Sequence, residues 1–124
     1  MLNIREFVYN KIKSLPWISE KVEDRIYSEK IWEEKFPCVI FSKISSKFNK
    51  IWVRTEFFQV SIWTQNIQEN DEILAIFINN FRHKTGDEVE LIQIWDVRTD
   101  KDLKNNLFAS HCEILMKFTD NFNT

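Results

Sequence analysis

The stretch TEFFQVSIWTQNIQENDEILAIFINNF, residues 55–81, decides the fold because it passes from the spacing of a strand to the spacing of a helix. Over residues 55–64, apolar side chains alternate along one face, as in a half-buried strand: Phe58, Val60 and Ile62. Polar turn residues follow, and an apolar stripe with helical spacing then runs from Asp71 to Phe81. The segment predicts a strand followed by a helix that packs on the sheet, with Asn70 or Asp71 as the N-cap.

The residues on either side supply the remaining elements. Residues 1–14 have the apolar spacing of an amphipathic helix, and Pro16 ends it. Phe36-Pro37 opens a second strand that includes the apolar run Cys38-Val39-Ile40-Phe41 and continues through Ile44. The last two strands are predicted at residues 89–97 and 108–118. Arg25-Ile26-Tyr27 forms either a turn of helix or a short edge strand, and residues 45–53 form a long hairpin loop or an extended ribbon.

The predicted fold class is therefore α+β, with a mostly antiparallel sheet of about four strands and two main helices packed on one face. With 124 residues, the chain is expected to form a single domain over residues 1–124 and to bury a core without disulfides or metals. Gly86 is the one glycine, and its position after the second main helix suits a helix C-cap.

Composition and charge exclude several classes of protein. Hydrophobic residues make up 44% of the chain and aromatic residues 15%, which argues against disorder. A net charge of −2 gives no general attraction to nucleic acid or membranes. No apolar run reaches the roughly 18 residues that cross a bilayer, and Met1 to Leu15 lacks the apolar core of a signal peptide. We therefore expect a cytosolic protein in which Cys38 and Cys112 are buried thiols.

The sequence contains no recognisable catalytic constellation. Its two histidines, His83 and His111, have no Ser, Cys or second His at a motif spacing, and Cys112 faces away from His111 in a strand. A single glycine rules out a glycine-rich phosphate loop. Asp96, Asp100 and Asp102 are better explained as a solvated hairpin tip than as a metal cluster. We expect no enzyme activity, no cofactor and no metal site.

Two oppositely charged segments are the candidate functional surfaces. The basic segment, residues 42–55, contains no acidic residue. It carries basic and aromatic side chains: Lys43, Lys47, Phe48, Lys50, Trp52 and Arg54. The acidic segment, residues 69–72, carries Glu69, Asp71 and Glu72. The basic segment is interpreted as a solvated ribbon or, equally, as a contact with a neighbouring subunit. Binding of single-stranded nucleic acid ranks below both.

Four short signatures together resemble a known family. They are the stretch Asp24-Arg25-Ile26-Tyr27, the strand Pro37-Cys38-Val39-Ile40-Phe41, the strand Gln59-Val60-Ser61-Ile62-Trp63, and the run from Ile94 to Asp100. The sequence resembles the tail-completion, or tail terminator, family of long-tailed phages and prophages, in which "RIY", "P-x-V-x-F" and "Q-V-x-(I/V)-W" recur in this order. The resemblance extends from Leu2 to Phe118, although residues 28–35 are more charged here than in the family.

The resemblance implies a structural protein that forms a ring, usually a hexamer, at the head-proximal end of the tail tube. Such a ring ends tube polymerisation and joins the tail to the head connector. The implied partners are further copies of the chain, the tail-tube protein and the head–tail connector protein, with no membrane and no sequence-specific nucleic acid. DNA can pass through the ring lumen. The implied location is the cytoplasm of the host bacterium during assembly and then the virion tail.

A ring has heterologous interfaces, in which two different surfaces of neighbouring copies meet. We infer that the basic ribbon from Lys47 to Arg54 and the acidic face from Glu69 to Glu72 form the two sides of such an interface. Alternatives from other classes are another neck or tail-tube subunit, a small nucleic-acid-binding module, and a small nuclease or acyl-transfer enzyme.

Overall fold

A computed structural model describes residues 4–15, 17–29, 35–50, 53–81 and 89–119. Its elements in chain order are α1 (Ile4–Lys13), α2 (Ile18–Val22), β1 (Ile26–Ser28), β2 (Cys38–Lys50), β3 (Val53–Thr64), α3 (Ile67–Phe81), β4 (Val89–Asp102) and β5 (Leu107–Thr119). The strands form one sheet in the order β1-β2-β3-β5-β4. The strand β1 runs parallel to β2, and the other neighbours are antiparallel.

The α+β class and the mostly antiparallel sheet are confirmed, but the sheet has five strands rather than four. The additional strand is β1, in which Ile26 pairs with Val39 and Ser28 with Phe41. Of the two interpretations of this segment, the edge strand is the one observed. The basic segment is an extended ribbon rather than a loop, because β2 and β3 remain paired out to Lys50 and Val53. The predicted cap at Gly86, like His83, lies outside the described residues.

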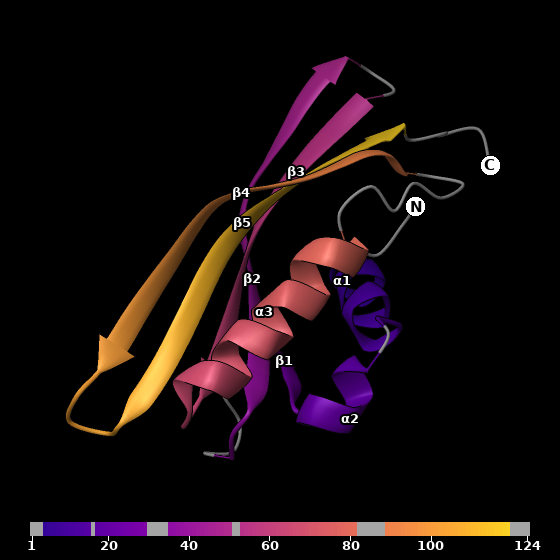
Figure 1. The fold of residues 1–124 in the computed structure, drawn as a ribbon. Helices are drawn as coiled ribbons and strands as arrows, with labels where there is room; N and C mark the ends of the chain where they lie inside the picture. The colour runs from indigo at the N-terminus through magenta and orange to yellow at the C-terminus, as the bar shows by residue number, and fades with distance from the viewer. Residues whose placement is uncertain (1–3, 16, 30–34, 51–52, 82–88, 120–124) are drawn as a thin grey trace.

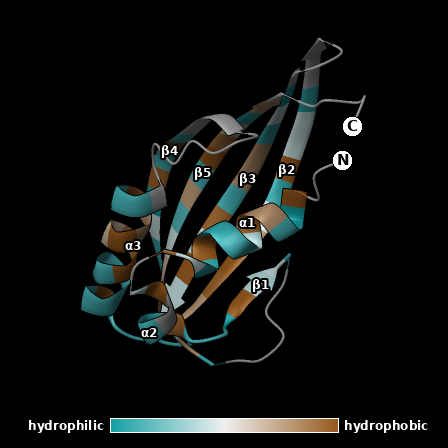
Figure 2. Ribbon diagram, turned by 90° about the vertical axis from the view of Figure 1, so that its right-hand side faces the viewer, coloured by the Kyte–Doolittle hydropathy of each residue, from teal (hydrophilic) through white to brown (hydrophobic). Residues whose placement is uncertain are grey.

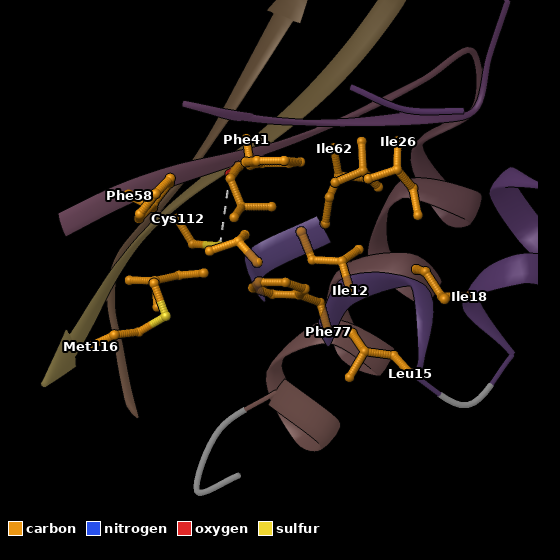
Figure 3. Packing of buried hydrophobic residues seen from close by; sticks show 14 of the residues in the cluster. Ile12, Leu15, Ile18, Ile26, Phe41, Phe58, Ile62, Phe77, Cys112 and Met116 are labelled. Atoms are coloured by element: carbon orange, nitrogen blue, oxygen red, sulfur yellow. Dashed lines mark hydrogen bonds between the residues drawn. The ribbon is translucent and has the colours of Figure 1, made fainter. Parts of the chain in front are cut away.

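All three helices lie on one face of the sheet, as Figures 1 and 2 show. In Figure 3, Ile12 and Phe77 of the helices point toward side chains of the sheet. The sheet side of this core consists of apolar residues that are fully or almost fully buried: Phe41, Phe58, Val60, Ile62, Cys112, Ile114, Met116 and Phe118. Burial of one such side chain stabilises the fold by about 1.5–3 kcal/mol. None of the helices in the described ranges is long and apolar enough to cross a bilayer.

Helix α3 begins earlier than the sequence pattern predicts. The predicted N-cap at Asn70 or Asp71 is wrong, because the helix starts at Ile67 and the Asn66 Oδ1 accepts the N–H of Glu69 at 3.1 Å. Asn70 instead lies within the helix and is completely buried. Asn66 and Asn70 can both act as an N-cap. Asn66 is the cap because the side chain of Asn70 is bound to other parts of the fold.

The strand β2 continues through Ile44 as predicted, but Ile44 does not belong to its buried run. The pairing with β3 shifts between Lys43 and Ser45, which leaves Ile44 as the extra residue of a β-bulge. Its side chain is half exposed.

The strands are longer than the helices that cover them. The 13 residues of β2 span about 43 Å, whereas the 15 residues of α3 span about 22 Å. Both hairpins therefore extend past the helices. The β2–β3 hairpin projects at the top of Figure 1 and the β4–β5 hairpin at the lower left, so the two point in opposite directions.

Candidate assembly surface

Two cations of the basic segment face the protein interior. The carboxylate of Glu56 is 1% exposed, and it lies 3.4 Å from the Lys43 Nζ and 3.3 Å from the Arg54 Nε. The hydroxyl of Ser46 donates a hydrogen bond of 2.5 Å to the same carboxylate. Arg54 is itself 6% exposed. Burial costs these charges less because they neutralise one another. We name these four residues the buried charge network.

The alternation of β3 explains this placement. Phe58 points into the core, so Glu56 and Arg54, two and four residues earlier, share its face. The Arg54 guanidinium lies 5.4 Å from the ring centre of Phe118. The rings of Phe118 and of Phe7 in α1 pack edge to face, with 5.4 Å between their centres. The network thus links the ribbon to a helix and to β5. Arg54 is therefore buried rather than on the surface, whereas Lys43 is partly exposed and its role in an interface stays a prediction.

The remaining residues of the basic segment are placed as follows. Lys47 is exposed, and its Nζ lies 5.5 Å from the ring centre of Phe57. Phe48 and Lys50 pair within the ladder with Arg54 and Val53, and Trp52 lies outside the described residues. Their role in an interface stays a prediction.

The acidic residues lie on the first half of α3. Asp71 and Glu72 are exposed and Glu69 is partly exposed. Glu72 accepts a 2.9 Å hydrogen bond from the Lys21 Nζ of α2, and this bond, with the carboxylate charge, raises the pKa of Lys21. In Figure 1 the start of α3 is at the bottom, and the β2–β3 hairpin is at the top. The two predicted surfaces therefore lie at opposite ends of one molecule, as the two sides of a heterologous interface can.

A polar chain on the uncovered face of the sheet is absent from the sequence predictions. The Ser61 Oγ lies 2.7 Å from the His111 Nδ1, and the His111 Nε2 lies 3.1 Å from the Asp100 Oδ2. Ser61 and His111 are direct partners across β3 and β5. Fifty residues separate them in the sequence, so only the strand register reveals the contact.

The Ser61–His111–Asp100 chain resembles a catalytic triad in composition but lacks its other requirements. Ser61 is only 8% exposed, so its hydroxyl is poorly accessible to a substrate. Its strand is paired on both sides, so the neighbouring N–H groups are used within the sheet and are not free to bind an oxyanion. Within the described ranges, no three acidic, histidine or cysteine side chains gather into a metal site.

The two thiols are buried as predicted. Burial raises the pKa of Cys38 to about 11 and that of Cys112 to about 12. Both thiols are therefore protonated at neutral pH and react slowly as nucleophiles.

The tip of the β4–β5 hairpin is a fixed turn. The Asp102 Oδ1 accepts the N–H groups of Lys104 at 3.1 Å and Asn105 at 3.2 Å, and the Asp102 Oδ2 accepts the side-chain amide of Asn105 at 2.8 Å. These bonds, led by the Asn105 side chain, lower the pKa of Asp102. The turn presents Leu103 with 78% of its side chain exposed.

Comparison with known proteins identifies a shared fold. No family model and no curated protein matches the sequence. Among solved structures, the chain is similar to one in the structure of the virion of a native gene transfer agent (GTA) particle. The two chains are 9% identical and superpose with a TM-score of 0.69 over 90% of this chain and 91% of the other. The two chains thus share a fold over about nine tenths of their lengths.

Proposed function

We propose that this chain is a structural subunit of a phage-type virion and, more narrowly, a tail terminator. The observation that carries the proposal is the shared fold with a chain of a gene transfer agent virion over about nine tenths of both molecules. The order of the short signatures, which resembles the tail terminator family, supports the same assignment. In this function, copies of the chain form a ring, usually a hexamer, that caps the tail tube and receives the head connector.

The arrangement of the sheet suits a role that depends on contact rather than chemistry. Two hairpins extend past the helices at opposite ends, and so the molecule can touch neighbours on either side of its body. A ring of identical subunits requires two different contact surfaces on each copy.

A tail-tube subunit is a second candidate, and the projecting β2–β3 hairpin favours it. Tube proteins use a long hairpin to stack one ring on the next, and this hairpin is the part of the chain that could serve in that way. A terminator stops at one ring, whereas a tube subunit continues to polymerise.

Native mass spectrometry over a range of concentrations, with negative-stain images of the same samples, tests the proposal. Closed rings of six, or of another small fixed number, support the terminator. Open-ended tubes support the tube subunit instead. A subunit that remains monomeric and fails to cap preformed tail tubes contradicts both.

A further inference from the structure

We propose that the tip of the β4–β5 hairpin docks on the start of α3 in a second copy of the chain. The tip consists of Lys101, Leu103 and Lys104. Its receiving surface consists of Ile67 with the neighbouring Asp71. The inference rests on the proposed function, because it requires copies of the chain to associate, and it replaces the ribbon as the partner of the acidic face.

The tip is prepared for binding before any partner arrives. Asp102 holds the turn through three hydrogen bonds, two to backbone N–H groups and one to the Asn105 side chain. Asn106 completes the turn in the left-handed region, with φ of 54°. A turn that is already ordered loses little conformational entropy when it docks. What it offers is an apolar side chain, Leu103, at 78% exposure, between the two exposed cations.

The receiving surface has the complementary chemistry. Ile67, the first residue of α3, keeps 44% of its side chain exposed. Asp71 is four residues further along and exposed, so it lies on the same side of the helix as Ile67. An exposed apolar residue with a carboxylate beside it matches an exposed apolar residue with ammonium groups beside it.

The ribbon is a poorer match for this acidic surface. Arg54 is buried beside Glu56, and Lys43 is partly exposed with its Nζ 3.4 Å from the Glu56 carboxylate. Lys47 packs against Phe57, as Lys101 of the tip packs against Phe108. The tip differs from the described part of the ribbon in Leu103, at 78% exposure, with the exposed Lys104 directly beside it.

The position of the two surfaces is compatible with a flat ring. In Figure 1 the hairpin tip and the start of α3 both lie toward the bottom, away from the β2–β3 hairpin. Copies that touch through these two surfaces can therefore lie side by side, without a shift along the long direction of the sheet in Figure 1. Each copy has one tip and one receiving surface, so the contact can be repeated head to tail around a ring.

The test compares charge and shape variants by native mass spectrometry and sedimentation. Leu103→Asp and the double variant Lys101→Glu with Lys104→Glu should each raise the concentration needed for half-assembly by about tenfold or more. Asp71→Lys should weaken assembly in the same way, and combining it with the double lysine variant should restore most of the loss. The matched control is Lys47→Glu with Lys50→Glu, which should leave assembly unchanged. Thermal unfolding of every variant should match that of the unsubstituted chain.

A photo-crosslinking amino acid at position 103 gives an independent readout. The expected product joins position 103 of one copy to the peptide that contains Ile67 of another. If the tip variants assemble normally, or the crosslink forms elsewhere or does not form, the inference is overturned. Closed rings that survive the tip variants would leave the terminator proposal standing without it. Tip crosslinks within open-ended tubes would support the docking contact and contradict the terminator.

Discussion

At the scale of single residues, Asn70 shows how one amide can fix the position of a helix on a sheet. Its side-chain N–H groups donate to the carbonyls of Ile62 at 3.0 Å and Phe108 at 3.1 Å, and its oxygen accepts the hydroxyl of Ser110. Asn70 and Ser110 are completely buried. Three elements, α3, β3 and β5, thus meet at one side chain.

Replacing Asn70 with Ala should lower the free energy of unfolding by about 2–4 kcal/mol, because two carbonyls and a hydroxyl lose their partner in a buried place. The measurement is urea unfolding followed by circular dichroism. The control is Asn79→Ala on the exposed side of the same helix, which should stay within about 0.5 kcal/mol. Equal effects of the two substitutions would contradict a special role for Asn70.

At the scale of elements, the hairpin tip responds to acid. Hydrogen bonds to the charged form lower the pKa of Asp102, the Asn105 side chain contributing most. A carboxyl whose pKa is lower in the folded state stabilises that state above its unfolded pKa, about 3.9, and loses this effect as pH falls through the folded pKa. The order of the turn should therefore persist at pH 4 and decline at more acidic pH.

Heteronuclear NMR of the Lys104 and Asn105 amides checks this, since both N–H groups bind the Asp102 carboxylate. Asp102→Asn removes the charge, so the mobility of these amides should then be independent of pH. Amides that keep their order at a pH where NMR shows the Asp102 carboxyl to be protonated, while the sheet stays folded, would show that the carboxylate charge does not hold the turn.

The sequence predicts elements better than it predicts their ends and their partners. The period-two pattern of β3 and the helical stripe of α3 are strong because burial repeats along each element. The start of α3 could not be predicted, since Asn66 and Asn70 are equivalent locally and differ only in what they meet in the folded chain. The exposed Ile44 depends on a bulge, and a bulge leaves no mark in the hydrophobic pattern.

The candidate surfaces were predictable in part. The acidic side chains of α3 could be predicted because they stand together, without a basic residue, directly before the apolar stripe. The burial of Arg54 could not be predicted, because a charged residue before a strand core normally lies on the solvent side. The contact of Ser61 with His111 depends on pairing between distant strands, which periodicity does not encode.

At the scale of the whole molecule, the buried charge network attaches the projecting β2–β3 hairpin to the body. Glu56 receives Lys43 and Ser46 from β2, while Arg54 packs on Phe118 of β5, which contacts Phe7 of α1. Glu56→Gln removes the charge that compensates the buried Arg54 and the partly buried Lys43. It should lower the free energy of unfolding by about 3 kcal/mol or more.

In the Glu56→Gln variant, amide hydrogen exchange should become faster in the β2–β3 hairpin, while the amides in the rest of the sheet change less. Glu113→Gln makes the same chemical change on the opposite face of the sheet, where the side chain is half buried, and should have little effect. A Glu56 variant as stable as the Glu113 variant would mean that the network does not hold the hairpin.

The strand order has a consequence for synthesis of the chain. The strand β5 lies between β3 and β4, yet the ribosome makes it after both. As the chain emerges, β3 can pair with β2. Its other edge stays unpaired until Leu107–Thr119, which forms β5, has been translated. An open strand edge invites pairing with other chains. The nascent protein is therefore most exposed to misassociation late in translation, and the insertion of β5 ends that interval.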